Sequence, residues 1–224
     1  MDPSLVLCPV GIGLDVGNEK ILCQHLFSYD QGNVKEIKDL FRCFKHFIFL
    51  CFFLFQPKLL SSDLLDLVAS YFNLKEKDYF GLAFLDETNH FNWLQLEKRV
   101  LDHDFPSKSG ILTLYFRVQF FMESINQLRD SITIELFYLQ AKESVFKGEI
   151  EADSETVFEL GAYVLQATEG DYTSDQKAHK VLKKLPVLPQ FTLREHPSLA
   201  YCEERILFYY KRLGGLSSGQ CIVW

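Results

Sequence analysis

The chain has 224 residues, 48% of them hydrophobic, which is enough to bury one large core or two smaller ones. Its 30 acidic residues outnumber its 23 Lys and Arg residues, and the resulting net charge of -7 disfavours nucleic acid as a partner, because phosphate binding needs a basic surface. The first residues lack the charged start of a secretory signal, and the six cysteines include no Cys-x-x-Cys pair, so we expect a cytoplasmic protein with reduced thiols.

One very apolar run, residues 47–55, is the only segment that suggests a membrane span. It is too short, because a helix needs about 20 residues to cross a bilayer. Extending it backward adds Lys45 and Arg42, which are costly at the membrane centre. We therefore expect a buried strand or sequence outside the domain, with a membrane tether through residues 46–56 as the alternative.

Taken in chain order, residues 1–44 show little sustained periodicity and several turn residues. Gly11, Gly13 and Gly17 superficially resemble a dinucleotide-binding loop, but the strand before it and the helix after it are missing. We expect this segment to be irregular or unrelated to the domain that follows.

Residues 45–120 become regular after Pro57. A helix begins at Ser61 or Ser62 and carries one apolar face. It is followed by a strand at 79–85, a turn at 86–89, a strand at 92–96, a helical turn at 99–104 and a strand at 111–120. This α+β order is compatible with a ubiquitin-like lobe, which would also need a hairpin before Pro57.

Residues 121–224 change to helical periodicity after Met122. Four helices are predicted, at 133–147, 154–168, 174–184 and 198–213. Pro186 and Pro189 interrupt the region as a linker, because each removes a backbone donor and clashes with the preceding turn. Residues 218–224 look like one further turn of helix. We therefore predict a helical second lobe.

Two motifs resemble signatures of the FERM domain, the module of band 4.1, ezrin, radixin and moesin. The first is Trp93-Leu94-x-Leu96-x-Lys98-Arg99-Val100, and the second is Gly161-x-Tyr163-x-x-Gln166 with Gly170-Asp171-Tyr172. Further stretches, among them 58–60, 63–70, 73–77 and 195–203, are similar to the FERM domain-containing protein 4 subfamily. The resemblance covers residues 56–223.

The resemblance implies a ubiquitin-like first lobe over residues 45–120 and an acyl-CoA-binding-protein-like helical second lobe over residues 121–224. It also implies a scaffold or adaptor that links membrane or junction proteins to the cortical cytoskeleton in epithelial polarity. The implied partners are cytoplasmic tails of membrane proteins, junction and polarity proteins, and cytohesin-type exchange factors. The implied location is the cell cortex, as a peripheral protein at the cytoskeleton and cell junctions.

The sequence departs from the family pattern in two places. We expect the third lobe to be absent and the second to be truncated at its C-terminal end, and residues 1–55 do not resemble the opening hairpin of the family. Two alternatives follow: an acyl-CoA-like carrier that uses the helical lobe, or a truncated product with little independent function. A truncated module of this kind should expose apolar faces and be less stable than a complete one.

No motif indicates catalysis, a metal or a cofactor. The histidines His90, His103, His179 and His196 are scattered, without the spacing of a zinc site. His103 lies between two aspartates, which a solvated turn explains better than a catalytic pair. The chain lacks the Gly-Lys-Ser/Thr loop of P-loop enzymes. We expect a protein that is not an enzyme.

The densest basic patch is the candidate binding surface. It consists of Lys177, Lys180, Lys183 and Lys184. Three of them have the spacing i, i+3 and i+7, so they share one helix face and could meet an anionic lipid or an acidic partner. The simpler interpretation is that these cations complement the helix dipole and keep the lobe soluble.

Overall fold

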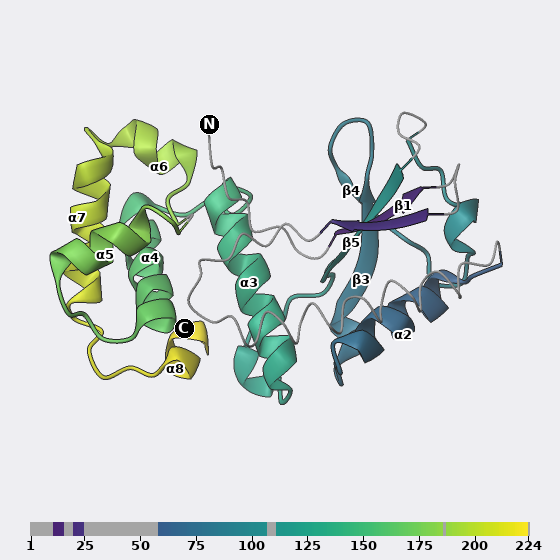
Figure 1. Cartoon of the computed structure of the whole chain (residues 1–224), viewed down its shortest axis with the longest axis horizontal. Helices are drawn as coiled ribbons and strands as arrows, with labels where there is room; N and C mark the ends of the chain where they lie inside the picture. Colours follow the sequence, from purple (N-terminus) through teal and green to yellow (C-terminus); the bar gives the residue numbers. More distant parts are fainter. Residues whose placement is uncertain (1–10, 16–19, 25–57, 107–110, 186, 224) are drawn as a thin grey trace. The chain divides into compact units, whose positions relative to one another are not determined.

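The structure, a computed structural model, describes residues 11–15, 20–24, 58–106, 111–185 and 187–223. The chain divides into two compact units between Met122 and Glu123. We call the unit before this point the sheet lobe and the unit after it the helical lobe, and each is described by itself (Figure 1). The run at residues 47–55 lies outside the described residues. Among those described, no helix is long and apolar enough to cross a membrane.

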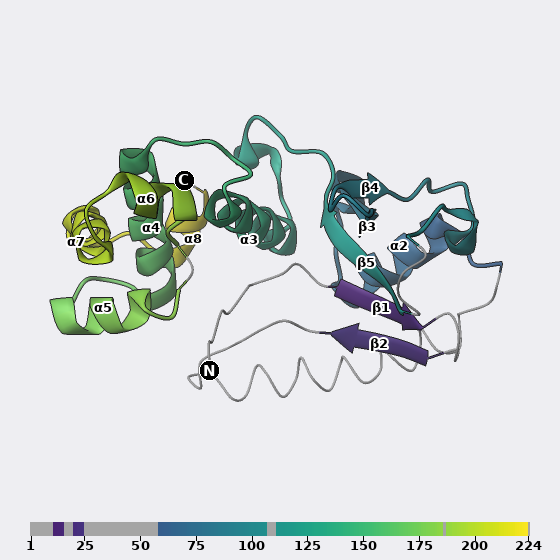
Figure 2. The same cartoon turned by 90° about the horizontal axis from the view of Figure 1, so that it is seen from above.

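The described strands of the sheet lobe form one sheet in the order β2-β1-β5-β3-β4, and every pairing between neighbours is antiparallel. Figure 2 shows β2 at one edge, next to β1. The strands are β1 (Gly11–Asp15), β2 (Lys20–Gln24), β3 (Phe80–Leu85), β4 (Phe91–Trp93) and β5 (Ile111–Val118).

The hairpin of β1 and β2 lies in the segment that we expected to be irregular. The strand β1 pairs with β2 on one side and with β5 on the other, joining Gly11 to Tyr115 and Asp15 to Ile111. Local patterns missed it because β1 contains two glycines, which weaken strand propensity, and because its pairing with β5 spans about a hundred positions of the chain. Gly11 and Gly13 therefore lie in a strand rather than in a dinucleotide-binding loop.

The helix α2 (Ser61–Tyr71) lies against one face of the sheet, where it contacts β3 (Figure 1). Its cap residue is Leu60, and neither predicted serine caps the helix with its side chain. The free N–H groups of its first turn instead donate to backbone carbonyls: Ser61 to Lys98 at 2.9 Å and Ser62 to Leu96 at 3.0 Å. The first signature motif therefore holds the start of α2.

The helical lobe contains six helices among the described residues. They are α3 (Ser131–Lys147), α4 (Ser154–Glu169), α5 (Asp175–Leu182), α6 (Gln190–Glu195), α7 (Leu199–Tyr210) and α8 (Ser218–Val223). The four predicted helices and the final turn are confirmed, with ends that differ by a few residues. The short helix α6 was missed because it has only six residues and directly follows Pro189, between the region interpreted as a linker and the next predicted helix.

The core of the helical lobe forms where α4 packs against α7. Phe158, Leu165 and Ile206 are fully buried there. The helices approach closely at Gly161, where a Cβ atom would lie 3.1 Å from Cδ1 of Ile206. The same lobe buries α8 against α3 and α4 through Cys221.

Candidate interaction surface on the helical lobe

The helix α5 carries the predicted basic patch. The Ser174 side chain caps its start by accepting a hydrogen bond from the Lys177 N–H at 3.3 Å. Ala178 and Leu182 are buried, and this apolar side fixes which way the remaining residues of α5 point. A helix of this length is held in place by packing of that side rather than by its own propensity.

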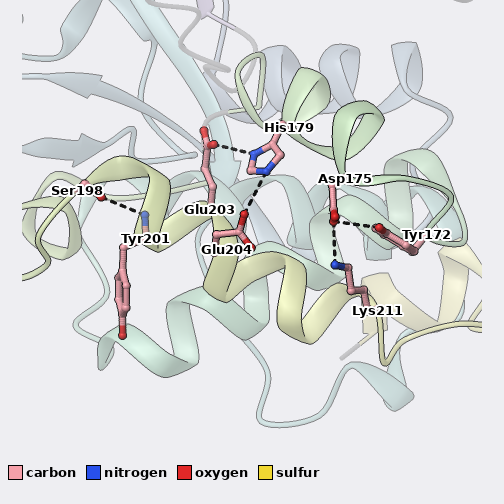
Figure 3. A network of polar contacts seen from close by, with 8 residues as sticks. All are labelled: Tyr172, Asp175, His179, Ser198, Tyr201, Glu203, Glu204 and Lys211. Atoms are coloured by element: carbon pink, nitrogen blue, oxygen red, sulfur yellow. Dashed lines mark hydrogen bonds and ion pairs between the residues drawn. The ribbon is translucent and has the colours of Figure 1, made fainter.

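One flank of α5 faces α7 and is held there by charge (Figure 3). The Asp175 carboxylate accepts a hydrogen bond from the Tyr172 hydroxyl at 2.9 Å and lies 2.8 Å from the ammonium of Lys211. The hydrogen bond from Lys211, followed by that from Tyr172, lowers the pKa of Asp175. The same contact raises the pKa of Lys211.

His179 makes the second link between the two helices. Its Nδ1 atom lies 2.8 Å from the Glu203 carboxylate, and its Nε2 atom lies 3.5 Å from Glu204 (Figure 3). Sequence reasoning missed this link because the partners are about 24 positions apart and have no shared local pattern. Asp175 and Glu203 are therefore engaged by the contacts between the two helices, whereas Glu204 stays largely exposed.

All four predicted lysines are exposed, with Lys177 and Lys180 within α5 and Lys183 and Lys184 directly after its last residue. Lys177 pairs with Glu169 at 3.1 Å. For Lys180 and Lys183, the described part of the chain offers no ion-pair partner. The structure thus places the predicted lysines on α5 and directly after it, beside the contacts that join α5 to α7. Such a surface can attract anions without binding them in a pocket.

The second signature motif forms structural hydrogen bonds within the helical lobe. Gln166 is buried, and its side-chain amide donates to the Asp171 carboxylate at 2.7 Å and to the backbone carbonyl of Leu216 at 2.9 Å. The same carboxylate accepts the N–H of Gly215 at 2.7 Å. These bonds tie the end of α4 to the loop between α7 and α8. They lower the pKa of Asp171, with the bond from Gly215 as the largest cause.

The rest of the motif supports the same junction. Gly170 ends α4 with φ 74° and ψ -151°, a conformation open almost only to glycine. Its carbonyl accepts the Tyr210 hydroxyl at 2.7 Å, and the Tyr210 ring packs edge-on against Tyr172 at 5.8 Å. Tyr163 is buried. The motif is therefore part of the architecture of the lobe.

The histidines also have structural partners. His103 accepts the backbone N–H of Gln95 at 2.9 Å, which fixes the turn after β4. His90 contacts the Thr88 hydroxyl at 2.7 Å. Among the described residues, no group of three or more His, Cys, Asp or Glu side chains could hold a metal ion. A cavity lined by Leu165, Lys177 and Tyr210, among others, has a volume of about 10 Å³, which is room for one water molecule.

Comparison with known proteins assigns both lobes. The model of the FERM N-terminal domain matches residues 51–105, and the model of the FERM central domain matches residues 123–224. A similar structure is the crystal structure of the FERM and C-terminal domain complex of Drosophila Merlin. The match covers 75% of this chain and 57% of the Merlin chain. The match has 27% identity and a TM-score of 0.66. This chain thus spans little more than half of the Merlin chain.

Two myosin structures have the same fold at lower identity. The MyTH4-FERM MF2 domain of Dictyostelium discoideum myosin VII, mutant 1, matches at 15% identity and a TM-score of 0.56, over 74% of this chain and 37% of its own. The human myosin 7b C-terminal MyTH4-FERM domain in complex with the harmonin-a PDZ3 domain matches at 14% identity and a TM-score of 0.54. This match covers 74% of this chain and 36% of the myosin chain. The fold class is confirmed as α+β, a ubiquitin-like lobe followed by a helical lobe. The two matched regions together exceed half of the chain, which therefore belongs to the FERM family and carries its N-terminal and central domains.

Proposed function

We propose that this chain is a non-enzymatic FERM-type adaptor that links membrane or junction proteins to the cortical cytoskeleton. The observation that carries the proposal is the division of charge on α5. Asp175 contacts Lys211 and His179 contacts Glu203, while Lys180 and Lys183 are exposed without an ion-pair partner in the described residues. These two lysines are therefore available to an anionic surface.

The surface that fits these lysines is the anionic cytoplasmic leaflet. A lysine is a compact, strongly hydrated charge on a flexible stem, so it suits a diffuse field better than a shaped site. Each basic residue near such a leaflet contributes about 1 kcal/mol. Four lysines therefore give weak, salt-sensitive attachment, and a protein partner must supply the remaining affinity.

Protein partners are proposed from the family. The Drosophila Merlin structure is a complex with a C-terminal domain, and the human myosin 7b structure is a complex with a PDZ domain, so FERM domains of this fold are found with protein ligands. For this chain we propose cytoplasmic tails of membrane proteins, junction and polarity proteins, and cytohesin-type exchange factors. We also propose membership of the FERM domain-containing protein 4 subfamily, a role in epithelial polarity, and domain limits at residues 45–120 and 121–224.

The test is the location of the chain in polarised epithelial cells. A fluorescent fusion of the whole chain should concentrate at the cortex and at junctions. The double variant Lys180→Glu, Lys183→Glu should lose this enrichment. The control variant Lys58→Glu, Lys98→Glu changes the net charge equally on exposed lysines of the sheet lobe and should keep the enrichment. A uniform distribution of the unmodified chain would contradict the proposal.

The alternative of an acyl-CoA-like carrier rests on fold similarity, which does not transfer a ligand site. The cavity beside α5 has room for about one water molecule, so an acyl chain would need another space in the lobe. A calorimetric titration with millimolar acyl-CoA decides this point, and we expect no heat of binding.

A further inference from the structure

The helix α7 has an outer face that no other described helix covers. Its inner side is buried against α4 and α5 through Ile206 and Leu207 (Figures 1 and 2). On the opposite side, Tyr201 is 41% exposed and Phe208 is 40% exposed. Aromatic residues together with arginine are the types that dominate the energetics of protein interfaces.

Phe208 is the centre of this outer face. The guanidinium carbon of Arg212 lies 3.7 Å from the centroid of its ring, and that of Arg205 lies 4.9 Å away. Arg205 is neutralised within the lobe, because it pairs with Glu155 at 2.6 Å. Arg212 has no carboxylate partner in the described residues. Of the two guanidinium groups that contact the Phe208 ring, that of Arg205 has a carboxylate partner and that of Arg212 has none in the described residues.

The unpaired negative charge of the same face is on Glu204. Its side chain is 66% exposed, and its contact is the 3.5 Å approach of His179. His179 lies closer to Glu203, at 2.8 Å, and brings at most one positive charge to the two carboxylates. Glu204 therefore retains negative charge, just as Arg212 retains positive charge.

The positions of these two charges are symmetric about the aromatic ring. Glu204 precedes Phe208 by four residues, and Arg212 follows it by four. We propose that the outer face of α7 binds the same face of a second copy of this chain, with the two helices antiparallel about Phe208. Each Glu204 then meets the Arg212 of the other copy, and the two Phe208 rings share the two-fold axis.

The remaining cations of the face do not oppose this pairing. An antiparallel arrangement also brings Arg205 toward Lys211 of the other copy, three residues on either side of the centre. Each of these cations has a carboxylate of its own, Glu155 for Arg205 and Asp175 for Lys211. Their mutual repulsion is therefore reduced, and the unneutralised pair decides the register.

One helix face limits the strength of the dimer. A stable interface buries about 800 Å² on each partner, and a single face of three helical turns offers less. The association is weak, with a dissociation constant on the order of 100 μM. It is also sensitive to salt, because the charges that set the register are exposed.

Sedimentation equilibrium of the whole chain, from about 5 to about 500 μM, measures this association. Glu204→Arg and Arg212→Glu should each raise the dissociation constant about tenfold, since each places like charges opposite one another. The double variant with both changes should restore it. Lys180→Glu, a charge reversal on α5 outside this face, should leave it unchanged.

Three outcomes overturn the proposal: a chain that stays monomeric over the whole range, association that persists in Phe208→Asp, or a double variant no better than the single ones. Far-UV circular dichroism and the thermal midpoint confirm that each variant is folded. Recovery in the double variant is itself proof against misfolding, because a fold damaged by either change would not be repaired by the other.

Discussion

The end of α4 and the exposed lysines of α5 lie next to each other in the chain but differ in how their polar groups are bonded. At the end of α4, Gln166 is 1% exposed, and both donors of its amide are bonded. On α5, Lys180 and Lys183 are exposed without an ion-pair partner in the described residues. The first region has its side-chain donors bonded within the lobe, whereas the second has its charges available to solvent.

The residues that identify the family therefore differ from the residues that we expect to bind a partner. The motif that identifies the family is the region that is bonded within the lobe, so its residues should govern stability. The lysines carry no family signature and can change without damage to the fold, so they should govern binding. Substitutions in the two regions should therefore affect different measurements.

The largest expected effect is at Gly161. In Gly161→Val, the new side chain meets Ile206, because its Cβ would already lie 3.1 Å from Cδ1. Overpacking of this kind lowers the free energy of unfolding by about 3 kcal/mol. Urea denaturation measures it. The control Gly219→Val, where nothing lies within 4 Å of a Cβ, should change stability by less than about 1 kcal/mol.

The next effect concerns the junction between α4 and the loop before α8. Gln166→Leu keeps the volume but leaves the Leu216 carbonyl without its donor, so we expect a loss of about 2 kcal/mol. Gln176→Leu, on the exposed side of α5, is the matched control and should be close to neutral. Equal losses in the two variants, in the same denaturation experiment, would remove the distinction between the two regions.

Gly170 tests the backbone of the same junction. Its φ of 74° with ψ of -151° is strained for any other residue, although nothing lies within 4 Å of a Cβ there. Gly170→Ala should therefore cost about 1 to 2 kcal/mol through conformation alone. Gly214→Ala also has open space but no positive φ, and should cost less than about 0.5 kcal/mol. Differential scanning calorimetry compares the two.

Acid sensitivity is a smaller effect of the same network. The bonds from Gly215 and Gln166 lower the pKa of Asp171 from the ordinary value of 3.8. A carboxyl group whose pKa is lowered in the folded state stabilises the fold at pH values above its ordinary pKa. This stabilisation is lost as the pH falls through the folded pKa. Between about pH 4 and pH 2, Asp171→Asn should therefore lose less stability than the unmodified chain. Parallel slopes of the two thermal midpoints against pH would contradict this.

The smallest effect on stability is expected on α5. The double variant Lys180→Glu, Lys183→Glu should keep its free energy of unfolding within about 0.5 kcal/mol, because neither side chain is engaged within the described residues. A larger loss in urea denaturation would mean that these lysines are structural, as the simpler interpretation of the patch holds.

The sequence predicted the local elements of this fold better than its long-range contacts. Helices with an apolar face, such as α3, α4 and α7, were readable because periodicity and capping residues are local. Strand β1 was not readable, because its glycines weaken the pattern and its position depends on pairing with β5. The sequence also predicted Ser61 or Ser62 as the cap of α2. The N–H groups at the start of α2 instead donate to backbone carbonyls of the turn after β4, which is a long-range contact.

The candidate surface was predicted in part. The lysine spacing on α5 follows from helical geometry, and all four side chains are exposed as that geometry requires. The contacts that hold the acidic flank, His179 with Glu203 and Asp175 with Lys211, join helices distant in the chain. Local spacing could not predict these contacts, because their partners are far apart in the sequence.

The most direct test of the central claim is co-sedimentation of the whole chain with phosphatidylcholine vesicles that contain about 30% phosphatidylserine. At low salt we predict binding that requires the anionic lipid, falls by at least about tenfold in Lys180→Glu, Lys183→Glu, and is unchanged in Lys58→Glu, Lys98→Glu. Binding that is equal in all three proteins, or that is lost equally in both variants, would contradict the assignment of the surface to α5.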